Sequence, residues 1–476
     1  MLEFALPLEK DKDKPIYMQL YEYIKREIIS GRIEPNTKLP SIRQLSSNLK
    51  VSRTTIEATY HQLYVEGYIV SQPKVGYFVN TIADNTFDNK KTSSINKADN
   101  IQETVSKMVE YDFRNDYIDR QSFDFTLWRK YLNKALMLDS ERFLTYGSHQ
   151  GEIELRKEIA KYVHQSRGVV CTPEQIIIGA GVQTLLSMLC GILKPHYTHI
   201  GFEDPGFRQA RYIFKDHNFN IIPIKLDNDG INVKLLAESK AKIVYVSPSH
   251  QFPMGSIMSI NKRIQLLNWA HENETLIIED DYDSELRYSG RPIPSLQGLS
   301  EGSNVIYLGT FSKILLPSMR ISYMILPPKL LALYKEHKKK YNQTSSQIEQ
   351  IALSLFMKEG MLEKHIRKLR KIYAKKNQLL ITTIDKIMKE KVTVMGTETG
   401  LHILLELKSP HTPDKITSLA EKVGVKVTPI SNYFINSSHN KYPLVLLSYG
   451  GIPIEHIEPA IKLLHKVWFE DNFHLG

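Results

Sequence analysis

Cysteine is scarce in this chain: only Cys171 and Cys190 occur among 476 residues, and the two do not form a CxxC pair. The sequence therefore offers neither a disulfide framework nor a cysteine metal site, and we expect no bound metal. It also lacks a run of about 18 apolar residues and a basic start followed by a long apolar segment. These absences exclude export and membrane spanning and favour a reducing cytoplasm.

A strong charge of one sign is also missing. The 62 Lys and Arg residues stand against 52 Asp and Glu residues, a formal net charge of +10, which permits acidic partners without identifying nucleic acid. Apolar residues make up 42% and charged residues 24%, a balance that excludes a disordered chain. At roughly 150 residues per domain, the length predicts two or three domains.

Composition divides the chain in two. Residues 82–111 are rich in Asp, Asn, Lys, Ser and Thr and have few large apolar side chains until their end. Such a segment is typical of a flexible connector. We therefore expect a DNA-binding or other small domain over residues 1–81, a linker over 82–111 and a larger domain over 112–476.

The first 81 residues carry three helical patterns followed by a hairpin pattern. The hairpin consists of two short strands around the Pro-Lys-Val-Gly turn, before residue 81. The helices are marked by an apolar stripe of Ile16, Leu20, Ile24 and Ile28, a capping box of Ser41 and Gln44, and an N-cap at Ser52 followed by inward-facing Ile56, Tyr60 and Leu63.

Helix, helix, turn, helix and hairpin is the order of a winged helix-turn-helix domain. Its third helix would present Arg53, Thr54 and Thr55 at its N-terminal end, where recognition helices meet base edges and phosphates. Lys74 at the wing tip would reach a neighbouring phosphate. The remaining candidate DNA contacts lie at the starts of the second and third helices: Ser41, Arg43 and Ser52.

The segment LPSIRQLSSNLKVSRTTIEATYHQLYVEGYIVSQPKVGYFV resembles the DNA-binding domain of the GntR family of bacterial regulators. The resemblance implies a double-stranded operator as partner. A small helical appendage that contacts protein is the alternative. A second basic feature, the run from Lys364 to Lys376, has helix-period charges around Ile366 and Leu369. It predicts a solvated helix face, with an auxiliary DNA-facing surface as the alternative.

After the linker, short Val- and Ile-rich runs alternate with helical stretches for over 200 residues. This pattern predicts strands buried on both faces of a mainly parallel sheet, in an α/β domain. In such sheets ligand groups collect where strands end and helices begin. The runs lie at 176–178, 199–202, 243–246, 276–278, 305–308 and 321–326.

Three motifs follow these runs and together indicate pyridoxal 5'-phosphate. GTFSKILLPSMR supplies Lys313, whose amine would form a Schiff base with the cofactor aldehyde. DDYDSEL supplies Asp280, which would hold the ring nitrogen protonated, and Tyr282, which would donate to the phenolic oxygen. GAGVQTLL opens a helix whose free amides suit a phosphate. The expected phosphate ligands are the amides of Val182 and Gln183, the hydroxyls of Thr310 and Ser312, and Arg320, while Phe207 would stack on the ring.

From about Asp112 to its end, the chain resembles the type I fold of pyridoxal-phosphate-dependent aminotransferases. PSHQFPMG, IIEDDYDSE and GTFSK, in that order, are similar to the MocR/GabR subfamily, whose members join a GntR-type domain to an aminotransferase-like domain. The resemblance implies a multidomain chain with an N-terminal winged helix-turn-helix and a C-terminal α/β aminotransferase fold. It also implies a head-to-tail, domain-swapped homodimer in which Tyr146 reaches the partner's cofactor phosphate.

The sequence departs from this family pattern where a substrate carboxylate is usually gripped. Leu446 stands at the position of the C-terminal arginine of amino acid aminotransferases. Gln209 and Asn432 occupy the places of two arginines in the GABA-responsive member, which argues against GABA as effector. Arg208 or Arg211 would be substitutes, or surface ion pairs.

The sequence therefore favours a transcriptional regulator that senses an amine or amino-acid effector by aldimine exchange at Lys313. In this hypothesis the aminotransferase-like domain is a sensor and not an enzyme. Two alternatives remain: a regulator for which pyridoxal phosphate itself is the signal, controlling vitamin B6 synthesis, and a working aminotransferase with a DNA-binding appendage.

Overall fold

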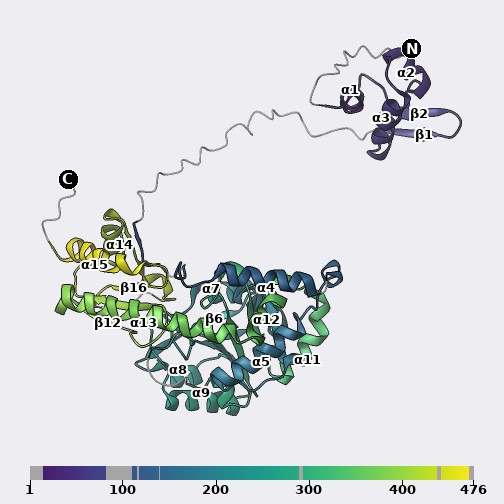
Figure 1. Cartoon of the computed structure of the whole chain (residues 1–476). Helices are drawn as coiled ribbons and strands as arrows, with labels where there is room; N and C mark the ends of the chain where they lie inside the picture. Colours follow the sequence, from purple (N-terminus) through teal and green to yellow (C-terminus); the bar gives the residue numbers. More distant parts are fainter. Residues whose placement is uncertain are drawn as a thin grey trace. The chain divides into compact units, whose positions relative to one another are not determined.

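The computed structural model of the chain describes residues 14–81, 110–114, 117–138, 140–288, 293–436 and 441–470. The chain divides into two compact units, Met1–Val105 and Ser106–Gly476 (Figure 1). Of the linker expected over residues 82–111, only Glu110 and Tyr111 lie within the described residues. In the described part of the chain, no helix is long and apolar enough to cross a membrane.

The first unit is a three-helix domain with a β-hairpin. Ser41 forms the predicted capping box with Gln44, and the Ser52 hydroxyl accepts a hydrogen bond from the Thr55 amide, so both caps are confirmed. The three helices and the hairpin enclose one apolar core that includes Leu20, Ile56 and Leu63. The elements are α1 (Ile16–Ile29), α2 (Ile42–Leu49), α3 (Arg53–Val65), β1 (Ile69–Gln72) and β2 (Gly76–Val79).

The second unit is built on an eight-stranded sheet of order β4-β11-β10-β9-β8-β5-β6-β7. The pairs from β10 through β9, β8 and β5 to β6 are parallel, whereas β11 and β7 pair antiparallel with their neighbours. All six predicted strand runs belong to it. The strands are β4 (Ile176–Gly179), β5 (His199–Asp204), β6 (Asn220–Asp227), β7 (Gly230–Ile231), β8 (Ile243–Val246), β9 (Leu276–Asp281), β10 (Val305–Thr310) and β11 (Ser322–Ile325).

Helices cover both faces of this sheet, because alternate strand residues enter different apolar cores. In β8, Ile243 and Tyr245 join the core around α6, whereas Val244 and Val246 join the core around α9. This two-sided burial explains the continuous apolar runs of the sequence. The helices of this region are α4 (Phe125–Leu138), α5 (Ile153–Arg167), α6 (Val182–Leu193), α7 (Arg208–Asp216), α8 (Val233–Glu238), α9 (Ile260–Glu272), α10 (Leu296–Leu299), α11 (Pro328–His337) and α12 (Gln347–Lys358).

A second, antiparallel sheet of order β12-β13-β16-β15 follows in the chain. Figure 1 shows the long helix α13 running from beside α12 toward α15 and this sheet. A short parallel pair joins β3 to β14. The elements are β3 (Tyr111–Asp112), α13 (Met361–Met388), β12 (Val392–Met395), β13 (His402–Leu407), α14 (Pro413–Lys422), β14 (Val425–Lys426), β15 (Thr428–Pro429), β16 (Leu444–Ser448) and α15 (Ile454–Phe469).

One end of the basic run on α13 differs from the expected solvated face. Lys376 is buried, and its ammonium lies 2.6 Å from Oδ2 of Asp119. The helical period explains the difference, because Lys376 follows the buried Leu369 and Tyr373 on the same side of α13. The prediction of a solvated face is therefore wrong at Lys376.

Candidate functional site

The predicted cofactor residues lie at adjacent strand ends of the eight-stranded sheet. β9 and β10 pair in parallel with Leu308 opposite Asp280. β10 ends at Thr310, and the half-buried Lys313 follows it in the next loop. The structure thus places Lys313 and Asp280 at the carboxyl ends of two neighbouring parallel strands, as the motif order predicts.

Asp280 is 5% exposed and holds one oxygen without a partner. Its Oδ2 accepts a hydrogen bond from the Tyr245 hydroxyl, whereas Oδ1 is buried and has no hydrogen-bond partner among the described residues. Burial raises the pKa of Asp280 to about 7, the Tyr245 hydrogen bond opposes that rise, and the charges of Asp281 and Asp283 add to it. Such a carboxylate is stabilised by a cationic group placed at Oδ1.

Tyr282 lies in an aromatic cluster with two histidines. The Tyr282 hydroxyl is 3.0 Å from Nδ1 of His250, which is also 2.8 Å from Oδ2 of Asp283. The His250 ring stacks on His402, with ring centroids 4.6 Å apart. Burial holds the pKa of His402 well below its ordinary range, and the charges of His250 and Lys313 add to this effect.

A cradle for an anion lies at the start of α6. Gly181 has φ +91°, and a methyl group built on it would lie 2.3 Å from Nη2 of Arg320, so the Arg320 guanidinium packs against this backbone only because the residue is glycine. Val182 and Gln183 are the first residues of α6, where amides lack intrahelical acceptors. Beside them, the Thr310 hydroxyl oxygen accepts hydrogen bonds from the Ser322 hydroxyl at 2.8 Å and from the Ser312 amide at 3.2 Å.

The strand order arranges these groups along one line. β4, which leads into Gly181, and β11 pair at Gly179 and Ser322, and β11 pairs with β10 at Ser322 and Thr310. Asp280 lies on β9, which is the strand next to β10. Adjacent strands are about 4.8 Å apart. This order of the start of α6 and the unpartnered carboxylate is compatible with a flat ligand that has a phosphate at one end and a ring nitrogen at the other, as pyridoxal phosphate has.

The candidate effector residues lie at the start of α7. Phe207 is the N-cap of α7, and its ring packs edge-on against Phe252, with centroids 6.2 Å apart. The Arg208 guanidinium lies 5.7 Å from the centre of the Tyr433 ring, next to the exposed Asn432. Three buried atoms here have no partner among the described residues: Nε of Arg208, Oε1 of Gln209 and Nη1 of Arg211.

Arg211 is less accessible than a surface ion pair would be. It is 7% exposed, and burial lowers the pKa of its guanidinium, although the charge of Asp204 opposes that change. Leu446, at the position of the family arginine, is fully buried in an apolar cluster with Phe252 and Leu404. The wall formed by β16 therefore offers no charge to a carboxylate.

Tyr146 contrasts with the other candidates because its side chain is 98% exposed. It follows a short 3-10 helix, η1 (Glu141–Leu144), whose last residue, Leu144, is also exposed. The structure therefore does not bring Tyr146 into the site of its own subunit, and its expected contact with a partner's phosphate stays a prediction.

The candidate DNA contacts are of two kinds, polar side chains at helix starts and exposed cationic side chains. The hydroxyls of Ser41 and Ser52 cap α2 and α3, and Thr54 and Thr55 hydrogen-bond to Ser52 at 2.7 and 2.8 Å. These four side chains shape the helix starts. The exposed cationic side chains that remain are Arg43 on α2, Arg53 at the first position of α3 and Lys74 at the hairpin turn.

Sequence reasoning missed the partners that hold the predicted residues in place. Tyr245, His250, Asp283, Ser322 and His402 all contact or adjoin them. Ser322 and Tyr245 reach the site through strand register, which one sequence does not reveal. His250 lay within PSHQFPMG, a segment that already carried a signal.

Two protein families match the chain. Residues 16–79 match "Bacterial regulatory proteins, gntR family", and residues 114–439 match "Aminotransferase class I and II". The first match coincides with the helix-hairpin unit, and the second includes the eight-stranded sheet and Lys313.

Relatives and solved structures agree with this division. An uncharacterized HTH-type transcriptional regulator of Bacillus subtilis (strain 168), YdeL, is 43% identical over 97% of this chain and 98% of its own. The HTH-type pyridoxine biosynthesis transcriptional regulator PdxR of Corynebacterium glutamicum is 30% identical over 90% of this chain and 91% of its own. A crystal structure of kynurenine aminotransferase from Pyrococcus horikoshii, in complex with PMP, has a TM-score of 0.69 and 26% identity over 76% of this chain and 91% of that one.

Proposed function

The chain belongs to the MocR-type transcriptional regulators, in which a GntR helix-turn-helix domain is joined to an aminotransferase class I and II domain, and from that premise we propose that it is a DNA-binding sensor of an amine-bearing effector, with pyridoxal 5'-phosphate as cofactor. The observation that carries the proposal is the unpartnered Oδ1 of the buried Asp280, which lies at the same sheet edge as Lys313.

When bound, the cofactor supplies an aldehyde that condenses reversibly with primary amines. Lys313 is the amine that holds it, because it follows the strand next to Asp280. A protonated ring nitrogen at Oδ1 of Asp280 keeps that buried carboxylate ionised, and Tyr245 fixes its orientation through Oδ2. Val182, Gln183, Thr310, Ser312 and Arg320 hold the phosphate, while Phe207 covers the ring.

Sensing requires that the effector bind one conformation of the protein better than another. An effector amine bound here would compete with Lys313 for the cofactor, and the charge of Lys313 acts on His402. His402 belongs to the second sheet and Lys313 follows β10 of the first, so a change at Lys313 would alter the interaction between the two sheets. We propose that this difference alters operator affinity or geometry through a head-to-tail dimer, in which Tyr146 completes the partner's phosphate site.

Arg53 and Lys74 are the proposed operator contacts, with Arg43 as a further phosphate ligand. Two DNA-binding domains on one dimer raise the effective concentration of the second contact, so modest charge per domain is sufficient.

A second candidate signal is pyridoxal phosphate itself. Two observations favour it: Leu446 removes the usual carboxylate ligand, and one relative is a pyridoxine biosynthesis regulator. In that case cofactor loading alone changes operator binding. Steady transamination of common amino acids would instead favour a working enzyme. The apolar side chains of β16, which offer no charge to a substrate carboxylate, argue against that function.

The test compares operator binding by apoprotein, cofactor-loaded protein and cofactor-loaded protein with a panel of amines and amino acids. An amine that changes binding of the loaded protein, and has no effect on Lys313→Ala, supports amine sensing. A change on cofactor loading alone, without any amine response, supports the second candidate. An amine response that persists undiminished in Lys313→Ala contradicts the proposal.

A further inference from the structure

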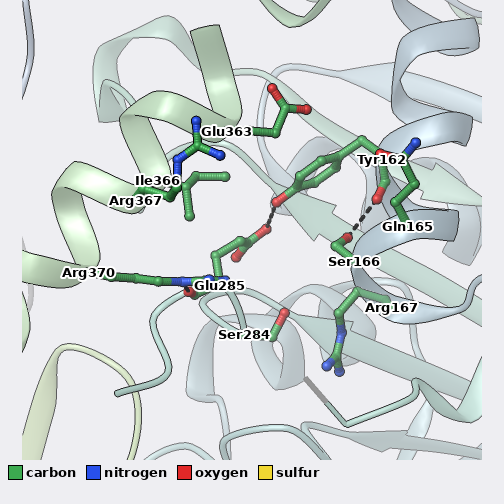
Figure 2. Close-up of a pocket in the computed structure, with 10 residues that line it drawn as sticks. All are labelled: Tyr162, Gln165, Ser166, Arg167, Ser284, Glu285, Glu363, Ile366, Arg367 and Arg370. Carbon is green, nitrogen blue, oxygen red and sulfur yellow. Dashed lines mark hydrogen bonds between the residues drawn. The ribbon is translucent and has the colours of Figure 1, made fainter. Parts of the chain in front are cut away.

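A cavity of about 310 Å³, lined by none of the proposed cofactor residues, lies between α5, the loop after β9 and α13 (Figure 2). This volume lies at the lower end of the range of volumes for small-molecule sites. Tyr162 and Gln165 line it from α5, Glu285 from the loop, and Arg367 and Arg370 from α13. The two arginines belong to the basic run that the DNA-binding and cofactor roles leave unused.

The buried side of the cavity carries an acceptor without a partner. Oε1 of Glu285 accepts a hydrogen bond of 2.7 Å from the Tyr162 hydroxyl, whereas the buried Oε2 has no partner among the described residues. Burial and the charge of Asp281 raise the pKa of Glu285 to about 7. Glu363, at the start of α13, also has one buried oxygen without a partner there. A cationic donor placed at Glu285 would relieve its desolvation.

Helix α13 brings two arginines to the cavity. Arg370 donates from Nε to the backbone oxygen of Glu285 at 2.6 Å, which leaves its terminal nitrogens for other acceptors, and Arg367 is exposed. In Figure 2 the Arg367 and Ile366 side chains extend from α13 toward the Tyr162 ring of α5, with Glu285 beside the Tyr162 hydroxyl. Arg167 is committed elsewhere, because its guanidinium pairs with Asp281 at 2.7 Å.

The charges of the side chains that line the cavity indicate which class of ligand it fits. Two carboxylates that each hold an unpartnered oxygen line the cavity together with two arginines, so a phosphate would meet Glu285 and Glu363, and a metal cation would meet Arg367 and Arg370. No group of three or more His, Cys, Asp or Glu in the described ranges is placed to hold a metal ion. A dipolar molecule satisfies both ends at once, with its apolar part against Ile366 and the Tyr162 ring.

We propose that this cavity binds a free amino acid non-covalently, with the ammonium at Glu285 and the carboxylate at Arg367 and Arg370. The bound molecule joins α5 to α13, the helix that leads into the second sheet. It is a site for a second effector, and its occupation does not depend on Lys313 or on the cofactor.

The probes are N,N-dimethyl derivatives of glycine, leucine and glutamate, whose tertiary amines stay dipolar and do not condense with an aldehyde. Isothermal titration of the full chain is expected to show saturable binding of at least one probe, unchanged in Lys313→Ala. Glu285→Gln, which keeps an acceptor for Tyr162, and Arg367→Gln, at an exposed position, should each weaken it at least 10-fold. Lys364→Gln, on the exposed side of α13, is the matched control and should bind like the wild type.

Three results would overturn the proposal. They are no binding of any probe, binding that Arg367→Gln and Glu285→Gln both leave unchanged, and binding that disappears in Lys313→Ala. The last result would move the ligand to the cofactor site. Because the Lys313→Ala protein is part of the design, failure of the proposed cofactor role leaves this test interpretable.

Discussion

Tyr245 and Asp280 lie on neighbouring parallel strands, and the Tyr245 hydroxyl donates a hydrogen bond to Oδ2 of Asp280. That bond fixes the carboxylate and leaves Oδ1 alone in a buried position. A buried acceptor without a partner is costly, and it persists where a ligand supplies the missing donor. In the proposed function, this pair of residues would therefore hold the cofactor ring nitrogen at Oδ1 of Asp280.

The raised pKa of Asp280 predicts a pH-dependent stability of the apoprotein. Burial raises this pKa from 3.8 to about 7, so the folded chain holds the proton more tightly than the unfolded chain between these values. The free energy of unfolding therefore falls as pH rises from about 4 to about 7. Asp280→Asn lacks this titration and should melt near the wild-type temperature at pH 4 and several degrees above it at pH 8.

Thermal melts of both apoproteins across this pH range check the prediction. Buried acids whose pKa does not depend on Asp280, such as Glu279 and Glu285, titrate in both proteins and cancel in the difference. A difference in melting temperature that does not change with pH would contradict the raised pKa of Asp280.

Gly181→Ala should weaken cofactor binding. The added methyl group would lie 2.3 Å from Nη2 of Arg320 at a residue with φ +91°, so the Arg320 guanidinium must leave the cradle. We expect a loss of at least about 10-fold in affinity, or about 1.4 kcal/mol, in a spectral titration with pyridoxal phosphate. Gly168→Ala is the matched control, because its φ is +68° and no atom lies within 4 Å of the added group. Equal losses in the two variants would mean that backbone strain alone is responsible.

Tyr146→Phe should lower cofactor affinity without lowering the thermal stability of the subunit. The side chain is 98% exposed, so removal of its hydroxyl costs no contact within the chain. We expect about a 10-fold loss in the spectral titration if the partner's phosphate is the acceptor. Tyr117→Phe, at a 55% exposed tyrosine, serves as control. Unchanged affinity in Tyr146→Phe would remove this residue from the site.

Lys74→Ala should weaken operator binding about equally across sequences, because a wing-tip lysine contacts phosphate and not bases. The slope of log affinity against log salt should become shallower by about 0.9. Arg53→Ala, at the start of α3, should instead relax sequence preference. Binding to duplexes selected from a random pool, at several salt concentrations, separates the two effects. Arg32→Ala, whose guanidinium pairs with Glu27 at 3.1 Å, should leave the salt slope unchanged.

Local features of the fold were predictable because a few neighbouring residues decide them. The caps at Ser41 and Ser52 depend on residues three positions away, and the runs before Asp280 and Lys313 are short and apolar. The second sheet was overlooked, although the runs at 392–395, 402–407 and 444–448 carry a strand signal.

Contacts set by strand register were not predictable. Ser322 pairs with Thr310 across antiparallel strands, and His402 meets His250 from the second sheet. Lys376 shows the same limit on a helix. Its charge indicates solvent, and only the fold reveals that Asp119 neutralises it within a buried face.

The most direct measurement is borohydride reduction of the pyridoxal-phosphate-loaded protein, followed by mass spectrometry of its peptides. Lys313 is predicted to carry the reduced cofactor, and Lys313→Ala should carry none, whereas Lys329→Ala, at an exposed lysine, should be labelled like the wild type. A cofactor adduct on another lysine, or no adduct on wild-type protein incubated with excess cofactor, would contradict the assignment of Lys313.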